Sequence, residues 1–217
     1  MALHDPIDIY CERTDASWLS EPVNALTNLA FLVAAYFLLR HYRRLGQRDA
    51  LIIPLMIIIA LVGLGSMAFH FLATSGTLLL DVIPIAMFIL YFLWLCFYRL
   101  FACSAIRSAW LALGFLGAQM FFTMLVGEET ANRSMGYVPC LLALFAIAWA
   151  LRRKNASASK HLFQSGLVFS ASLFFRTVDM QLCDAFPLGT HFLWHILNGL
   201  LLYRFGYILM INNRKTA

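Results

Sequence analysis

The chain has 217 residues, of which 62% are hydrophobic and only 12% are charged. Soluble domains are about half apolar and a quarter charged, so this composition excludes an ordinary soluble domain. The net charge of +5 could indicate nucleic-acid binding, but the basic residues lie beside apolar runs, where a membrane-topology signal is expected. The sequence therefore predicts an integral membrane protein whose surroundings are lipid, with no nucleic-acid partner.

Residues 1–24 form an acidic segment before the first apolar run. Its acidic residues are Asp5, Asp8, Glu12, Asp15 and Glu21. The segment lacks the basic start followed by an apolar stretch that characterises a cleavable signal peptide. We therefore expect it to belong to the mature fold.

Seven apolar runs approach the length of about 20 residues that a helix needs to cross a bilayer. They are Ala25–Leu39, Leu51–Leu72, Thr77–Phe97, Trp110–Val126, Tyr137–Leu151, Leu162–Leu182 and Thr190–Met210. Continuous apolar runs favour helices over a β-barrel, whose strands alternate in polarity. We expect an all-α bundle of seven spans over residues 25–210, with six spans as the alternative. Because no long linker or repeat divides the chain, residues 1–217 are interpreted as one domain that ends in a cytoplasmic tail, residues 211–217.

The connection Ala73–Gly76 is so short that the second and third spans must form a tight antiparallel hairpin. In the seven-span arrangement, thirteen of the sixteen basic residues fall on one side of the membrane. The positive-inside rule makes this side the cytoplasm, so the amino terminus is expected outside and the carboxyl terminus inside. Cys11 and Cys183 then lie outside, where a disulfide can form, and two unrelated thiols are the alternative.

Ionisable residues within membrane spans are costly to place in lipid and are therefore functional candidates. Here they are His70, Asp81, Arg176, Asp179, His191 and His195. Three histidines and Asp81 fall in the outer parts of their spans. Arg176 and Asp179 are three residues apart and are interpreted as a structural ion pair within one helix.

The spacing of the histidines favours a metal site. His191 and His195 are four residues apart and project from one helix face. Such a pair alone is more often a packing feature between membrane helices. With His70 as the third imidazole, the set matches the three protein ligands of a catalytic zinc site, which keeps its fourth position open.

Two further residues could serve such a site. Asp81 could be a fourth ligand, a hydrogen-bond partner of a ligand, a base or a carboxylate paired with a histidine for packing. We favour a base that takes a proton from water. Ser66, one turn before His70, could donate to the oxyanion that forms during attack, or could be a small residue for close helix packing.

Stretches along nearly the whole chain resemble the alkaline ceramidases and their bacterial relatives. The stretches are GLGSMAFHFLATSGTLLLD, FRTVDMQLC and THFLWHILNG, with YCER and SEPVNALTNL near the start. That family belongs to a wider group of seven-span, zinc-dependent membrane hydrolases that includes the adiponectin-receptor-like proteins. The resemblance implies a hydrolase that cleaves ceramide into a sphingoid base and a fatty acid. Together with the expected orientation, it predicts a bacterial inner-membrane protein with its active site towards the periplasm.

The resemblance also assigns roles to residues. The zinc ligands that it implies are His70, His191 and His195. Asp81 would handle the proton of the attacking water, and Ser66 would assist the carbonyl oxygen. A disulfide would join Cys11 to Cys183.

A calcium ion in the amino-terminal segment is a further implication of the resemblance. The acidic residues concerned are Glu12 and Glu21, which match family positions, and Asp8 and Asp15, which could supply further oxygens. Calcium tolerates six to eight oxygen ligands in flexible geometry. The match is incomplete, because Ile9 stands where an acid is expected and Tyr10 where tryptophan is usual. A merely solvated acidic segment is the alternative.

Two other classes of function remain as alternatives. A receptor-like or structural seven-span protein would use zinc only to brace its helices, and such a brace needs ligands but no base. Asp81 therefore favours the enzyme. A transporter would be expected to show discontinuous helices or paired half-repeats, and the sequence shows neither.

Overall fold

The computed structural model describes residues 3–46, 49–127 and 130–212. Most of the expected cytoplasmic tail therefore lies outside the described residues. The described chain contains helices and no named strand, as the sequence predicted. The elements are α1 (Pro22–Thr27), α2 (Leu29–Arg44), α3 (Ile52–Leu72), α4 (Ser75–Arg99), α5 (Ala105–Val126), η1 (Met135–Tyr137), α6 (Val138–Leu151), α7 (Ala156–Val178), η2 (Met180–Leu182) and α8 (His191–Ile211).

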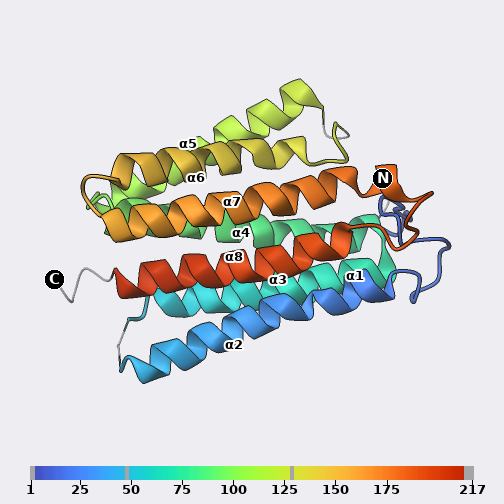
Figure 1. Ribbon diagram of the computed structural model, residues 1–217, viewed down its shortest axis with the longest axis horizontal. Coiled ribbons are helices and arrows are strands. Elements are labelled where there is room, and N and C mark those ends of the chain that lie inside the picture. Colours follow the sequence, from blue (N-terminus) through green and yellow to red (C-terminus); the bar gives the residue numbers. More distant parts are fainter. Residues whose placement is uncertain (1–2, 47–48, 128–129, 213–217) are drawn as a thin grey trace.

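Five helical stretches are long and apolar enough to cross a membrane: α1 together with α2, then α3, α4, α5 and α8. The two other expected spans correspond to α6, which is shorter, and α7, whose apolar run is interrupted by polar residues such as Gln164 and Arg176. Both run alongside the other helices in the same bundle (Figure 1). The chain is therefore a multi-pass membrane protein.

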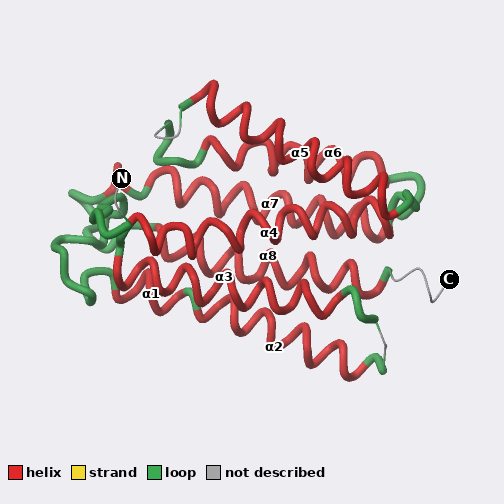
Figure 2. Tube along the Cα trace, turned by 180° about the vertical axis from the view of Figure 1, so that it is seen from behind, coloured by secondary structure: helices red, strands yellow, loops and turns green. Residues whose placement is uncertain are grey.

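Helix α8 lies in the interior of the bundle. It packs against α2 and α7 and also contacts α3 and α4. Its buried residues occur along its whole length, from His191 to Met210. By contrast, α5 buries only Ser108 and Ala112, so most of its apolar surface faces outward, as expected for a helix in contact with lipid. Figure 2 shows the irregular amino-terminal segment gathered at one end of the helices.

The expected hairpin between the second and third spans is present as α3 and α4. Ala73 adopts a left-handed backbone conformation (φ 41°) and ends α3. Thr74 and Thr77 then form a reciprocal capping box that starts α4 at Ser75, two residues earlier than predicted. The first turn of α4 is thereby fixed against the end of α3.

One predicted boundary is wrong in a way that matters for the site. The sixth apolar run was expected to remain a span as far as Leu182, but α7 ends at Val178. Asp179 leaves the helix, and its carboxylate accepts hydrogen bonds from the backbone at the start of α8. Asp179 therefore binds the backbone at the amino terminus of α8 instead of continuing α7.

Candidate metal centre

Three buried histidines meet at the end of the bundle that carries the amino-terminal segment. His70 lies in the last turn of α3, while His191 and His195 occupy the first two turns of α8. One potential ligand atom from each lies within 4.8 Å of the others. Each histidine is only 1% exposed. The structure thus brings together the three residues that the sequence selected.

The outer ring nitrogens of two histidines are held by neighbouring side chains. His70 Nδ1 lies 2.6 Å from a carboxylate oxygen of Glu21, and His195 Nδ1 lies 3.0 Å from the Thr27 hydroxyl. Metal-binding histidines commonly engage their second nitrogen in this way, which fixes the ring and its tautomer. The opposite nitrogens of both rings remain directed towards the shared space.

The inner nitrogens have the spacing that a shared ion requires. The Nε2 atoms of His70 and His195 are 3.1 Å apart, so they must share either a proton or a cation. Zinc–nitrogen bonds of about 2.0–2.1 Å in a tetrahedron place two ligand nitrogens roughly 3.3 Å apart. The Nδ1 of His191 is buried without a hydrogen-bond partner in the described chain. This donor set fits a metal ion.

Asp179 fixes the start of α8 and therefore the position of His191. Its Oδ1 atom accepts hydrogen bonds from the backbone N–H groups of Thr190 (2.7 Å) and His191 (2.9 Å), and its Oδ2 atom accepts one from Cys11 (3.0 Å). The N–H groups of Thr190 and His191 would otherwise lack partners at the helix terminus. Gly189 has φ 66°, and a side chain there would collide with the Asp179 carboxylate. A carboxylate at this terminus also suits the helix dipole.

The expected ion pair between Arg176 and Asp179 is not formed. The backbone N–H groups occupy the Asp179 carboxylate, whereas Arg176 Nη1 donates to the Tyr10 hydroxyl at 3.0 Å. The guanidinium carbon lies 5.1 Å from the centroid of the Trp194 ring and 5.6 Å from that of Tyr137. Arg176 is therefore held by aromatic faces, a favourable environment for a buried guanidinium.

Tyr10 links this arginine to the histidines. Its ring stacks on His191 with a centroid distance of 3.7 Å and lies 5.1 Å from the ring of His70. Tyr10 is 3% exposed, and burial raises the pKa of its hydroxyl. The phenol therefore stays protonated near neutral pH, and its ring covers that of His191.

Asp81 joins the same buried cluster from α4. It is 9% exposed, and its Oδ1 atom has no hydrogen-bond partner in the described ranges. The Ser66 hydroxyl lies close enough to stabilise the carboxylate charge, and Arg176 interacts electrostatically with Asp81 and with all three histidines. A buried, incompletely bonded carboxylate requires an explanation, and a role in handling protons is one.

A glycine allows Ser66 and Asp81 to approach each other. The α-carbon of Gly65 in α3 faces the backbone carbonyl of Leu80 in α4 so closely that a Cβ atom there would overlap the oxygen. Pro84 has no N–H, so the Leu80 carbonyl also lacks its normal partner one turn later in α4. A Cα–H···O contact from Gly65 is well placed to meet it.

A disulfide and a backbone hydrogen bond hold the amino-terminal segment over the histidines. A disulfide joins Cys11 to Cys183, with Cα atoms 5.4 Å apart, as the family resemblance implied. The backbone N–H of Cys11 also bonds Asp179. Two independent links therefore hold Tyr10, the neighbour of Cys11, against His191.

Among the described residues, the four acidic residues of the expected calcium site do not form a group of three or more that could share an ion. Glu12 accepts hydrogen bonds from the backbone N–H groups of Val23 and Asn24, both at 2.7 Å, and Asp8 and Asp15 are exposed. Glu21 is buried between Arg13 and His70. Within the described ranges, the three histidines form the only group of three or more His, Cys, Asp or Glu side chains that could hold a metal ion.

Sequence reasoning missed several residues around the histidines. Tyr10, Arg13 and Thr27 carry no recognisable spacing, and Glu21 was assigned to calcium. Only the packing of α1 against α3 and α8 brings Thr27 and Glu21 to the rings. A signal was nevertheless present, because buried histidines generally need a partner for the second nitrogen and the acidic segment offered candidates.

An apolar cavity of about 100 Å³ lies within the bundle near this cluster. Its lining includes Phe88, Phe92, Phe115 and Phe205. Trp194, the neighbour of His195, and Ile85, one turn beyond Asp81, also line it. The cavity thus lies close to the polar cluster and is lined mostly by apolar side chains.

Comparison with known families agrees with this arrangement. The family model described as Ceramidase matches residues 10–216, which include every residue of the cluster described above, and the chain therefore belongs to the Ceramidase family. No curated protein matches the chain. Family membership supports an amidohydrolase that acts on ceramide, a membrane lipid.

Proposed function

We propose that the protein is a zinc-dependent amidase that hydrolyses ceramide within the membrane. The observation that carries this proposal is the buried convergence of His70, His191 and His195, with the buried Asp81 carboxylate linked to the same cluster through Ser66 and Arg176. Three histidine ligands with an open fourth position are typical of catalytic zinc, whereas structural zinc is closed by four protein ligands. When bound, zinc supplies Lewis acidity, which polarises an amide carbonyl and acidifies water.

The residues of the chain have complementary roles in this proposal. Asp81 accepts a proton from the water that attacks the carbonyl carbon, and it returns the proton to the amine nitrogen as the carbon–nitrogen bond breaks. The products are a fatty acid and a sphingoid base. Ser66, held against Asp81, donates a hydrogen bond to the developing oxyanion. Glu21 and Thr27 hold two of the histidine rings in their orientation.

The apolar cavity supports a lipid substrate. Its aromatic and aliphatic lining is suited to an acyl chain, because each methylene transferred from water contributes about 0.8 kcal/mol. The cavity lies next to Trp194 and Ile85, so a chain within it would bring its amide towards Asp81. The acyl chain of the lipid then stays in apolar surroundings while its amide group reaches the polar cluster.

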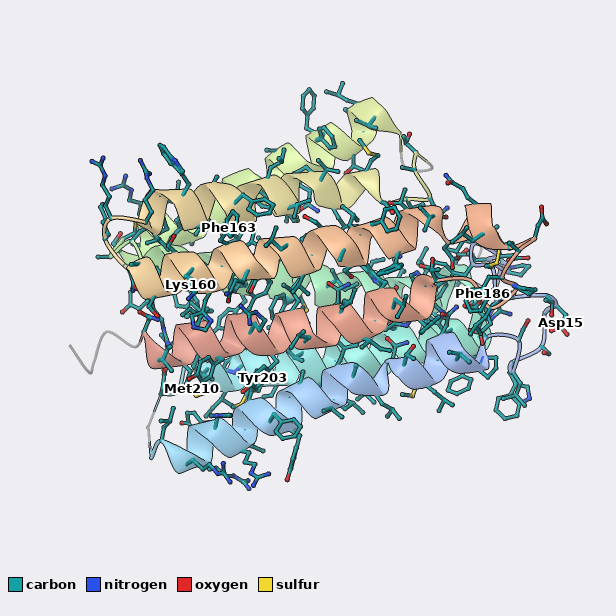
Figure 3. All side chains as sticks on the ribbon, in the orientation of Figure 1. Asp15, Lys160, Phe163, Phe186, Tyr203 and Met210 are labelled. Carbon is teal, nitrogen blue, oxygen red and sulfur yellow. A yellow bond between two sulfur atoms is a disulfide. The ribbon has the colours of Figure 1, made fainter. Side chains whose placement is uncertain are left out.

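The proposed membrane topology rests on the histidines and most of the basic residues lying at opposite ends of the helix bundle. The histidines lie with the amino-terminal segment, where Figure 3 labels Asp15 and Phe186, while Lys160 and Met210 are labelled towards the opposite end. We propose that α6 and α7 complete seven spans. In that arrangement the cluster faces outward, which in a bacterial inner membrane is the periplasmic side, and the basic end faces the cytoplasm.

Fatty-acid release from a panel of ceramides by the purified protein tests the proposal. The zinc content is measured on the same samples. Release by zinc-loaded protein that stops after zinc is removed and returns when zinc is added back would support it. Zinc-loaded protein that cleaves no lipid amide would instead favour a receptor-like or structural protein braced by the metal.

A further inference from the structure

The guanidinium of Arg13 occupies a buried cage of oxygen atoms next to the histidines. Its Nε donates to Glu21, its Nη1 to the backbone carbonyls of Asp15 (3.1 Å) and Ser17 (3.4 Å), and its Nη2 to the carbonyl of His70 (3.0 Å). Arg13 is 8% exposed and Glu21 is 2% exposed. A buried arginine with every nitrogen bonded is uncommon on an outer segment and indicates a specific role.

A calcium ion does not fit this arrangement. Glu21, one of the two expected ligands at matching family positions, already contacts Arg13, His70 and Asn24. Glu12 caps the start of α1 with both carboxylate oxygens. Calcium needs six to eight oxygens around one point, and the cation that the cage oxygens surround is instead the arginine side chain.

We propose that Arg13 is the built-in cation of the outer segment and a positioning residue for His70, so that this segment needs no divalent ion. The inference deepens the proposed function, because it concerns the support of the same metal centre. The positive charge of the Arg13 side chain then takes the place of a bound divalent ion.

Arg13 reaches His70 by two routes. The first passes through Glu21, whose one carboxylate oxygen accepts from Arg13 while the other lies 2.6 Å from His70 Nδ1. The second is the direct bond to the His70 carbonyl, near the end of α3, where helix carbonyls lack partners within the helix. The planar guanidinium of arginine can donate to the Glu21 carboxylate and the His70 carbonyl at once, whereas the ammonium of lysine is a single point charge.

The test measures zinc affinity, by competition with a chelator, for the wild type, Arg13→Ala, Arg13→Lys and Glu21→Gln. Loss of a group that orients a ligand typically weakens metal binding about 10–100-fold, which is the fall expected for Arg13→Ala. Arg13→Lys should recover only part of it. Arg44→Ala, an exposed arginine at the other end of the bundle, is the control and should bind zinc like the wild type.

A double variant separates positioning from general destabilisation. Because Arg13 acts largely through Glu21, the combined Arg13→Ala and Glu21→Gln variant should lose clearly less zinc affinity than the product of the two single losses. If the loss of zinc affinity in the double variant equals the product of the two single losses, the proposed link between Arg13 and Glu21 is wrong. An intact Cys11–Cys183 disulfide in each variant, checked by mass spectrometry, shows that the segment is still fastened.

Calcium provides the second arm of the test. Elemental analysis of the purified wild type should find no stoichiometric calcium, and added calcium should change neither zinc affinity nor thermal stability. Bound calcium in the wild type, or unchanged zinc affinity in Arg13→Ala, would overturn the inference. Neither readout uses a substrate, so a wild type that binds zinc as expected but cleaves no amide would refute the proposed enzyme and leave the role of Arg13 intact.

Discussion

Gly65 of α3 and Leu80 of α4 are in direct backbone contact, and this contact brings the two helices together close to the three buried histidines. Ser66 and Asp81 are the next residue on each helix. The position of the proposed base is therefore set by a glycine that has no chemical role of its own.

Gly65→Ala should destabilise the protein and displace Asp81. An added Cβ would overlap the Leu80 carbonyl, which is backbone and cannot move aside cheaply. Overpacking of this kind typically costs about 1–3 kcal/mol. We expect a lower thermal midpoint and a large loss of hydrolysis. Gly114→Ala in α5 is the control, because no atom lies within 4 Å of its added Cβ. Equal behaviour of both variants would refute the importance of the contact.

Alanine at His70, His191 or His195 should remove most of the metal. The purified wild type should hold about one zinc per chain, and each substitution leaves only two imidazoles for an ion that needs three protein ligands here. Elemental analysis of the purified variants provides the measurement. Near-stoichiometric zinc in all three variants would show that the metal is bound elsewhere.

Ser66→Ala should reduce turnover without affecting metal content. Removing one donor to an oxyanion typically costs about 10²–10³ in turnover, and Ser66 does not belong to the histidine group. Steady-state hydrolysis and zinc content should be measured on the same preparation. Unchanged turnover would restrict Ser66 to helix packing, the alternative that the sequence left open.

The orientation in the membrane can be tested at both ends of the described chain. A reporter placed before Leu3 should be external, and one fused after Asn212 should be cytoplasmic, because an odd number of spans separates them in the proposed topology. Accessibility to an impermeant thiol or proteolytic probe would measure this. Both ends on one side would support six spans instead of seven.

The sequence predicted the parts of the site that depend on local spacing and on the cost of charge in lipid. The pair His191 and His195 follows from a four-residue interval, and His70 and Asp81 from a connection too short to let two helices separate. These constraints act within one helix or one hairpin, so they can be read without the remaining fold.

The remaining parts depend on contacts distant in sequence. Arg176 and Asp179 have the spacing of an ion pair within a helix, but α7 ends between them, because Asp179 is needed at the start of α8. Tyr10 and Arg13 lie in an irregular segment whose course is set by the Cys11–Cys183 link and by Asp179. No periodicity marks such residues.

The most direct test of the account compares wild type with Asp81→Asn, measuring zinc content and fatty-acid release from ceramide on the same purified samples. Asparagine keeps the shape of the side chain but cannot take a proton, so the variant should retain its zinc and lose roughly a hundredfold or more in turnover. Parallel loss of zinc and activity would make Asp81 a ligand. Full activity in the variant, or no hydrolysis of any lipid amide by zinc-replete wild type, would contradict the proposed mechanism.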